Sequence, residues 1–143
     1  MKIANILFPT DFSARSLTAR EHALYLSDAL GASVYLLHAI EPLNYDEVDE
    51  EVSNFYKTLG AQLNEKMSLE KEIFHKRGLA THTDIIIGPR WKVINTYAVE
   101  KRIDLIIMGS HGLRAESGEV SVGTTSHKVM FSSPCPVLIV RHA

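Results

Sequence analysis

Glycines and residues with hydroxyl side chains cluster near the carboxyl end of the chain, in a pattern that is suited to binding phosphate. Residues 108–112 read Met-Gly-Ser-His-Gly, and ten residues later the chain reads Gly-Thr-Thr-Ser at residues 123–126. Glycine allows positive φ and a close backbone approach to a ligand, and free N–H groups at the start of a helix bind phosphate oxygens. The pattern therefore indicates a phosphate-binding turn, although tight turns and a helix cap account for the same residues without any ligand.

A second group of candidate residues follows the first apolar stretch of the chain. Residues 9–13 read Pro-Thr-Asp-Phe-Ser, and the carboxylate of Asp11 can accept hydrogen bonds from a ribose hydroxyl or a base amino group. The same carboxylate also suits an Asx turn or the positive end of a helix. Neither Gly-x-Gly-x-x-Gly nor Gly-Lys-Ser/Thr is present, so backbone N–H groups and hydroxyls would have to hold any phosphate.

The elements that position these residues are short apolar strands. Four stretches are rich in β-branched residues and apolar without alternation, which is typical of strands that are covered on both faces. They are residues 3–8, 34–39, 105–108 and 137–140. A fifth stretch, residues 83–87, begins among polar residues, and we expect it at the edge of the sheet.

Helical periodicity separates these strands. We expect helices at residues 13–30, 46–77, from residue 90 onward and 124–131. The apolar residues that we expect on their buried faces are Ala19, Ala23, Leu26 and Leu30 in the first, Val52, Phe55, Leu59, Leu63 and Met67 in the second, and Trp91, Ile94 and Ala98 in the third. Ser13 would cap the start of the first helix, and Gly31 would cap its end.

Alternation of strand and helix demands a parallel sheet with right-handed crossovers and helices on both faces. We expect one three-layer α/β domain over residues 1–143, with four helices and a five-stranded Rossmann-like or flavodoxin-like sheet of strand order 3-2-1-4-5. In such sheets, ligands bind beyond the carboxyl ends of the strands, where the strand order reverses. Both groups of candidate residues follow predicted strands and should meet there.

The composition excludes several classes of protein. The chain has 143 residues, of which 45% are hydrophobic, and this is enough for one domain with a buried core. A formal net charge of −2 provides no basic field, so we expect no nucleic-acid partner. The single cysteine, Cys135, cannot form an internal disulfide, no Cys/His pair has zinc-ligand spacing, and no apolar run reaches the ~18 residues of a membrane span. We expect a cytoplasmic protein without a membrane span or a structural metal.

Four segments of the chain resemble the universal stress proteins. The sequence ILFPTDFS at residues 6–13 looks like the opening strand and turn of this family, and LLHA at 36–39 looks like its second strand. DLIIMGSHG at 104–112 is close to the fourth strand, and SPCPVLIVR at 133–141 resembles the last one. The resemblance covers nearly the whole chain in the right order, and it implies that His38 is a structural feature of the second strand.

The resemblance also implies a nucleotide site. ATP-binding members of the family are similar in carrying Gly-x-x-Gly, nine residues, and then Gly-Ser/Thr, which Gly109, Gly112 and Gly123 match with a spacer of ten residues. The spacer also holds Glu116 and Glu119, two acids that are unfavourable near a triphosphate unless Mg²⁺ lies between them. The residues that would bind ATP or another adenine nucleotide, with or without Mg²⁺, are Pro9, Thr10, Asp11, Ala39, Met108, Gly109, His111, Gly112, Gly123, Thr124, Thr125 and Ser126.

By this resemblance, Asp11 and the backbone at Ala39 would face adenine and ribose, and Met108 with Gly109 would flank the sugar. Gly112 and residues 123–126 would hold the phosphates, while His111 would either contact the ligand or stabilise the turn. Because of the extra residue in the spacer, the adenosine contacts match the family more closely than the phosphate contacts do.

The candidate residues favour binding over catalysis. Phosphoryl transfer needs an oriented nucleophile and concentrated positive charge, whereas only Arg114 and Lys128 are near the predicted phosphate end. We therefore expect no catalytic residues and a regulatory, stress-response binding protein. The alternatives are a dimeric interaction protein that has lost its nucleotide and a slow ATPase. By resemblance, the last strand, residues 136–140, would pair two copies into a homodimer.

Overall fold

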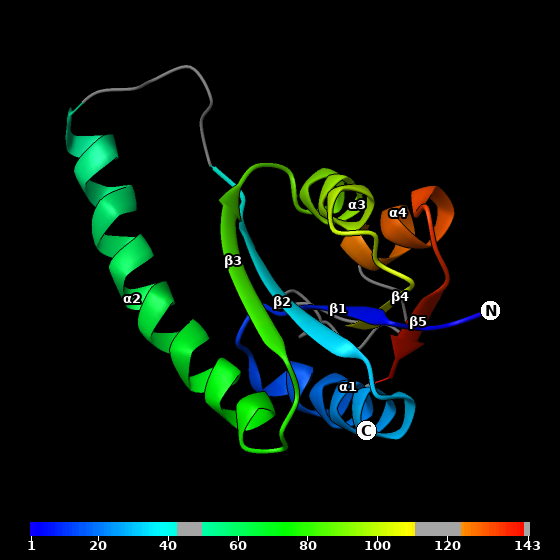
Figure 1. The fold of residues 1–143 in the computed structure, drawn as a ribbon. Helices are drawn as coiled ribbons and strands as arrows, with labels where there is room; N and C mark the ends of the chain where they lie inside the picture. Colours follow the sequence, from blue (N-terminus) through cyan, green and yellow to red (C-terminus); the bar gives the residue numbers. More distant parts are fainter. Residues whose placement is uncertain (43–49, 111–123, 142–143) are drawn as a thin grey trace.

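Five parallel strands form the middle layer of the protein (Figure 1). The computed structural model describes residues 1–42, 50–110 and 124–141. The strands are β1 (Asn5–Pro9), β2 (Ser33–Ile40), β3 (Thr81–Ile87), β4 (Leu105–Gly109) and β5 (Val137–Val140). Their spatial order is β3-β2-β1-β4-β5, which confirms the predicted order and places the polar-starting strand β3 at one edge.

The first strand begins two residues later than the apolar run suggested. The backbone N–H groups of Ala4 and Asn5 both donate to Oδ2 of Asp104, at 2.8 and 2.9 Å. Asp104 directly precedes β4. Its carboxylate accepts two hydrogen bonds that the backbone of a neighbouring strand would otherwise accept. Pairing between β1 and β2 then starts at Asn5 opposite Ser33.

Two helices cover each face of the sheet. α1 (Leu17–Leu30) and α2 (Glu50–His75) lie on one face, and α3 (Arg90–Glu100) and α4 (Thr124–Ser132) lie on the other (Figure 1). Successive residues of β1 alternate between the two cores. Ile6 and Phe8 pack with α1 and α2, whereas Leu7 packs with α3 and α4. Every residue from Ile6 to Phe8 is therefore buried, which explains the continuous apolar sequence.

The start and the buried face of the first helix differ from the expectation. A 3-10 turn, η1 (Ala14–Ser16), precedes α1, and the hydroxyl of Ser13 forms no capping hydrogen bond. The buried positions are Ala19, Ala23, Leu24 and Ser27, while Leu30 is 46% exposed. Leu30 is exposed because it is the last residue before Gly31, which ends the helix with a φ of 65° as predicted.

The second helix lies on the sheet over only part of its length. Leu63, Met67 and Phe74 are buried, but Phe55, which we expected on the same buried face, is 60% exposed. Figure 1 shows that the amino-terminal half of α2 leans away from β3. In the third helix, Ile94 and Ala98 are buried as predicted, together with Tyr97. No helix in the described part of the chain is long and apolar enough to cross a bilayer.

Candidate functional site

The strand order reverses between β1 and β4. β1 pairs with β2 on one side and with β4 on the other, and the 3-10 turn η1 that follows β1 packs against β4. The loops that leave β1 and β4 therefore start side by side. This is the place where open parallel sheets bind their ligands.

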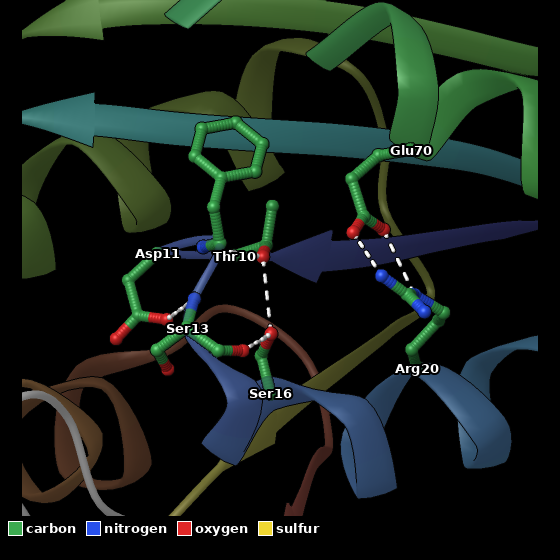
Figure 2. A network of polar contacts seen from close by, with 7 residues as sticks. Thr10, Asp11, Ser13, Ser16, Arg20 and Glu70 are labelled. Carbon is green, nitrogen blue, oxygen red and sulfur yellow. Dashed lines mark hydrogen bonds and ion pairs between the residues drawn. The ribbon is translucent and has the colours of Figure 1, made fainter. Parts of the chain in front are cut away.

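The loop after β1 is held in shape by its own side chains. The N–H of Thr10 donates to the carbonyl of Leu37, which extends the pairing with β2 by one residue. The hydroxyl of Thr10 accepts a 3.0 Å hydrogen bond from the N–H of Phe12, and the hydroxyl of Ser16 donates to the carbonyl of Ser13 at 2.7 Å (Figure 2). Thr10 is buried, so these bonds fix the start of the loop.

Asp11 uses one of its two carboxylate oxygens within this loop. Oδ1 accepts a 2.9 Å hydrogen bond from the N–H of Ser13, which is the i to i+2 pattern of an Asx turn. Oδ2 takes no part in that bond, and Figure 2 shows it pointing away from the other labelled side chains. The turn thus fixes the carboxylate and leaves one oxygen as an acceptor.

His38 ties the same loop to β2. Its Nδ1 lies 2.7 Å from the carbonyl oxygen of Thr10, and because a carbonyl can only accept, Nδ1 carries the proton. The ring also lies against Phe12, with 4.8 Å between the ring centroids, and Phe12 has the rare φ of 62°. Burial lowers the pKa of His38, and the hydrogen bond to Thr10 opposes that shift. These contacts confirm the prediction that His38 is a structural feature of the second strand.

The end of β4 is tied to the start of α4. The hydroxyl of Ser126 donates a 2.7 Å hydrogen bond to the carbonyl of Gly109, and the N–H of Ser110 donates to Val140 on β5. Met108, Ser110 and Ser126 are all buried. α4 is thereby anchored with its first turn at the carboxyl end of β4, as a phosphate-binding helix would need to be.

A sequence profile of the Universal stress protein family matches residues 2–141. The chain belongs to this family. It is 31% identical to the Universal stress protein in QAH/OAS sulfhydrylase 3'region of Thermus aquaticus, and the match covers 95% of this chain and 97% of that one. Universal stress protein MJ0577 of Methanocaldococcus jannaschii is 28% identical over 95% of this chain and 93% of its own length. The solved structure of MJ0577 has a TM-score of 0.91 and covers 100% of this chain and 99% of that one.

Two solved structures of universal stress proteins that share this fold contain nucleotides. One is a complex with cAMP, with a TM-score of 0.74, 20% identity and coverage of 100% of both chains. The other is the protein from Archaeoglobus fulgidus in complex with dAMP, with a TM-score of 0.69, 20% identity and coverage of 97% of this chain and 98% of that one. At this identity, the likeness establishes the shared fold.

Most of the predicted site residues of this universal stress protein lie at neighbouring strand ends. Pro9 ends β1, and Thr10 and Asp11 follow it. Met108 and Gly109 end β4, and Ala39 lies near the end of β2, where it is buried. Thr124 begins α4, and Thr125 and Ser126 follow in its first turn. His111, Gly112 and Gly123 lie outside the described residues, and their roles stay predictions.

Two hydroxyls in this region were missed by the sequence interpretation. Oγ of Ser13 and Oγ of Ser110 are buried and have no hydrogen-bond partner in the described part of the chain. A buried hydroxyl without a partner is costly, so a ligand or water is expected to supply one. Ser110 stands between Gly109 and His111 in a segment that already indicated phosphate, and this position was the signal that could have identified it.

The described residues provide no metal centre of their own. Among residues 1–42, 50–110 and 124–141, no group of three His, Cys, Asp or Glu side chains could hold an ion. Mg²⁺ binds nucleotides through phosphate oxygens and water, with one or two carboxylates. A magnesium ion at this site would therefore depend on the nucleotide for most of its ligands.

Proposed function

We propose that this universal stress protein binds ATP or another adenine nucleotide in the crevice between the ends of β1 and β4. One observation carries the proposal. At the point where the strand order reverses, Oδ2 of Asp11 is free of the loop's own hydrogen bonds, and the buried hydroxyls of Ser13 and Ser110 have no partner among the described residues. These groups match the polar edges of a nucleotide.

The two ends of the crevice suit different parts of the ligand. A carboxylate oxygen accepts hydrogen bonds from ribose hydroxyls or from the amino group of adenine, so Asp11 would bind the adenosine. The hydroxyl of Ser110 and the N–H groups at the start of α4 are donors, so they would bind phosphate oxygens. The hydroxyl of Ser126 already donates to Gly109, and we assign it the role of holding α4 in place.

The complexes of related proteins support an adenine nucleotide over other ligands. The cAMP and dAMP complexes both contain adenine, a sugar and one phosphate group, and both proteins share this fold. Their phosphate groups are smaller than a triphosphate. The adenosine end of the site is thus the better supported half. This agrees with the resemblance to the family, in which the residues around Asp11 match without an inserted residue.

We further propose that the protein is a regulatory binding module and not an enzyme. Phosphoryl transfer requires cations directed at the transferred group. Nζ of Lys128, the lysine in α4, lies 5.7 Å from the centre of the Trp91 ring, where it makes a cation-π contact. The site groups identified among the described residues are hydroxyls, N–H groups and the Asp11 carboxylate, which recognise a nucleotide without activating it. Arg114 lies outside the described residues.

Mass spectrometry of the small molecule released by denaturing the purified protein would test the proposed function. We expect an adenine nucleotide, and we expect calorimetry of the emptied protein to give saturable binding of ATP, ADP, AMP or cAMP. If none of the four binds, the interaction-protein alternative is correct. If bound ATP with Mg²⁺ is converted to ADP within minutes, the protein is an enzyme and the proposal of a binding module is wrong.

We also propose that the protein is a homodimer formed through β5. β5 is the outermost strand beside β4, and Val137, Leu138 and Ile139 are only half-buried within one copy. Pairing two copies along this edge would cover those side chains and satisfy the open backbone groups. The bonds from Ile106 to Pro136 and from Ser110 to Val140 direct the even-numbered backbone groups of β5 to β4, so the N–H of Ile139 faces outward. Sedimentation equilibrium should give twice the chain mass, and Ile139→Pro should give the mass of one chain.

A further inference from the structure

His38 contacts both neighbours of Asp11 in the loop that follows β1. Its Nδ1 lies 2.7 Å from the carbonyl oxygen of Thr10, the residue before Asp11. Its ring also lies against the ring of Phe12, the residue after Asp11, with 4.8 Å between the centroids and 34° between the planes. One side chain of β2 therefore holds the backbone on both sides of the carboxylate that would bind the adenosine.

Phe12 needs such support because of its backbone conformation. Its φ of 62° lies in the left-handed region, which bulky residues rarely adopt and which persists only where surrounding contacts impose it. The N–H of Phe12 donates a 3.0 Å hydrogen bond to the hydroxyl of Thr10, and its ring packs against the core that α1 and α2 cover. The contact with His38 adds to these two.

The Asx turn of Asp11 depends on the same backbone conformation. Oδ1 of Asp11 accepts a 2.9 Å hydrogen bond from the N–H of Ser13, the residue directly after Phe12 (Figure 2). The direction of that N–H is set by the dihedral angles of Phe12, because these angles orient the peptide plane that carries it. A change in the conformation of Phe12 would therefore turn the carboxylate of Asp11 as well.

His38 acts on this loop as a neutral hydrogen-bond donor. Burial lowers the pKa of His38, and the hydrogen bond to Thr10 opposes that shift. Of the charged groups around the ring, Arg90 and Lys66 lower the pKa further and Asp11 raises it. The ring is therefore neutral at pH 7.5, with its one proton on Nδ1. A neutral amide placed at the same point could replace it.

We propose that His38 is a positioning residue of the nucleotide site, which sets the affinity for adenine nucleotides by fixing the carboxylate of Asp11 without contacting the ligand itself. This role rests on the proposed function, in which Asp11 binds the adenosine. A site binds with its full affinity only if its contact groups are held in the bound orientation before the ligand arrives. If the loop adopts that orientation for only about a tenth of the time, the apparent affinity is about tenfold lower.

A matched pair of amide substitutions tests this role. The side-chain NH₂ of Asn reaches the place of Nδ1, whereas that of Gln lies one bond farther, at the place of Nε2. We expect His38→Asn to bind ATP and AMP within about threefold of the unaltered protein and His38→Gln to bind them about tenfold more weakly, the effect of one hydrogen bond. Calorimetry at pH 7.5 measures the affinities. His82→Asn and His82→Gln, at an exposed position of β3, are the controls and should bind as the unaltered protein does.

A purely structural role of His38 predicts a different result. His38→Gln would then unfold at a lower temperature, but the folded fraction would bind nucleotide as tightly as the unaltered protein does. Equal affinity of the Asn and Gln variants would therefore overturn the proposal. If the unaltered protein binds no adenine nucleotide, the proposed function itself is wrong and the positioning role falls with it, a result that differs from equal binding by the two variants.

A double variant tests whether His38 acts through Asp11. Asp11→Asn removes the charge that His38 positions, so adding His38→Gln to it should change ATP affinity by less than about twofold, whereas independent effects would multiply. Multiplied effects would mean that His38 acts on the ligand by another route, and they would overturn the proposal.

Phe12→Leu takes the place of His38→Gln if that variant does not fold. It keeps an apolar side chain in the core but loses the ring that lies against His38. We expect it to lower the ATP affinity of the unaltered protein at least about threefold, and to leave that of Asp11→Asn unchanged. Unchanged affinity in the first case, or a further loss in the second, would reject the positioning role.

Discussion

Oδ1 of Asp11 accepts a 2.9 Å hydrogen bond from the N–H of Ser13, so a structural turn and a candidate ligand contact share one carboxylate. An Asx turn requires only an oxygen acceptor, whereas recognition of a ribose or adenine donor by Asp11 uses the second oxygen and the charge that the two oxygens share. The two roles can therefore be separated by a substitution that keeps the first oxygen and removes the charge.

Asp11→Asn should weaken adenine-nucleotide binding by about tenfold to a hundredfold while leaving the fold intact. The amide oxygen can still accept from Ser13, but the second position becomes an NH₂ donor that faces the donors of the ligand. A hydrogen bond to a charged group is worth about 1.5–3 kcal/mol, which sets the expected range. Titration calorimetry with ATP and with AMP measures the effect.

Asp11→Ala provides the matched comparison, since it removes the turn as well as the charge. We expect it to lose nucleotide affinity and also about 1 kcal/mol of folding free energy, as the loss of a capping side chain does. If Asp11→Asn binds nucleotide as tightly as the unaltered protein, Asp11 has only its structural role.

His38 should make the stability of the protein fall as the pH falls below about 6.5. Burial lowers the pKa of His38 below its ordinary value of 6.5, so the unfolded chain binds this proton more readily than the folded one. The stability contributed by the neutral ring is complete above pH 6.5 and is lost as the pH falls toward the lower folded pKa. Thermal unfolding at pH 7.5 and at pH 5.5 would measure the loss.

His38→Asn separates His38 from the other six histidines of the chain. Its side-chain NH₂ can donate to the carbonyl of Thr10 as Nδ1–H of the histidine does, but it does not titrate. The variant should therefore lose less stability between pH 7.5 and pH 5.5 than the unaltered protein. An identical pH dependence in the two proteins would show that other groups cause it.

The inner strands β1, β2 and β4 were predictable because each is covered on both faces. Ile6, Leu7 and Phe8 alternate between two cores, so the run is apolar throughout, which is typical of a central parallel strand. The same reasoning placed β3 at the edge, since a strand that starts with polar residues is not covered on both faces there.

The exposed half of α2 was not predictable from periodicity. Phe55 and Met67 belong to the same helical stripe, yet Phe55 is exposed and Met67 is buried. The 26 residues of α2 span about 39 Å at ~1.5 Å per residue, whereas the eight residues of β2 span only about 26 Å. A helical pattern identifies the apolar face but not the length of the sheet that it meets.

The two unpartnered serines show a similar limit within the site. Ser13 and Ser110 are ordinary turn residues in sequence, and they become candidate ligand contacts only because the folded chain buries both hydroxyls without a partner among the described residues. Burial and lack of a partner are properties of the packed chain. Asp11 could be proposed from sequence because a charge at the end of a predicted strand is informative by itself.

Gly123→Val should abolish ATP binding without unfolding the domain. Gly123 directly precedes α4, and a branched side chain there would occupy the path by which a phosphate approaches the N–H groups of the helix. Calorimetry measures ATP affinity, and thermal unfolding checks the fold. The same substitution at Gly118, which the family motif does not include, should keep the affinity. Unchanged ATP binding by Gly123→Val would reject the assignment of residues 123–126 to the phosphates.

Arg20 and Glu70 join α1 to α2 through an ion pair whose two partners differ in exposure. Nε of Arg20 donates to Oε2 of Glu70 at 3.0 Å, and Nη2 contacts Oε1 (Figure 2). The side chain of Glu70 is 8% exposed and that of Arg20 is 22% exposed. Removing Arg20 would therefore leave the more deeply buried charge without its partner.

Arg20→Met should destabilise the protein by about 3 kcal/mol, and Glu70→Leu by less, because Arg20 can turn its guanidinium toward water. The double variant, Arg20→Met with Glu70→Leu, should be within about 1 kcal/mol of the unaltered protein, since an apolar pair can replace a buried ion pair. Urea unfolding of the four proteins gives the coupling energy. If the double variant loses as much as the two single variants together, the two side chains contribute independently and the pair does not hold α2 against α1.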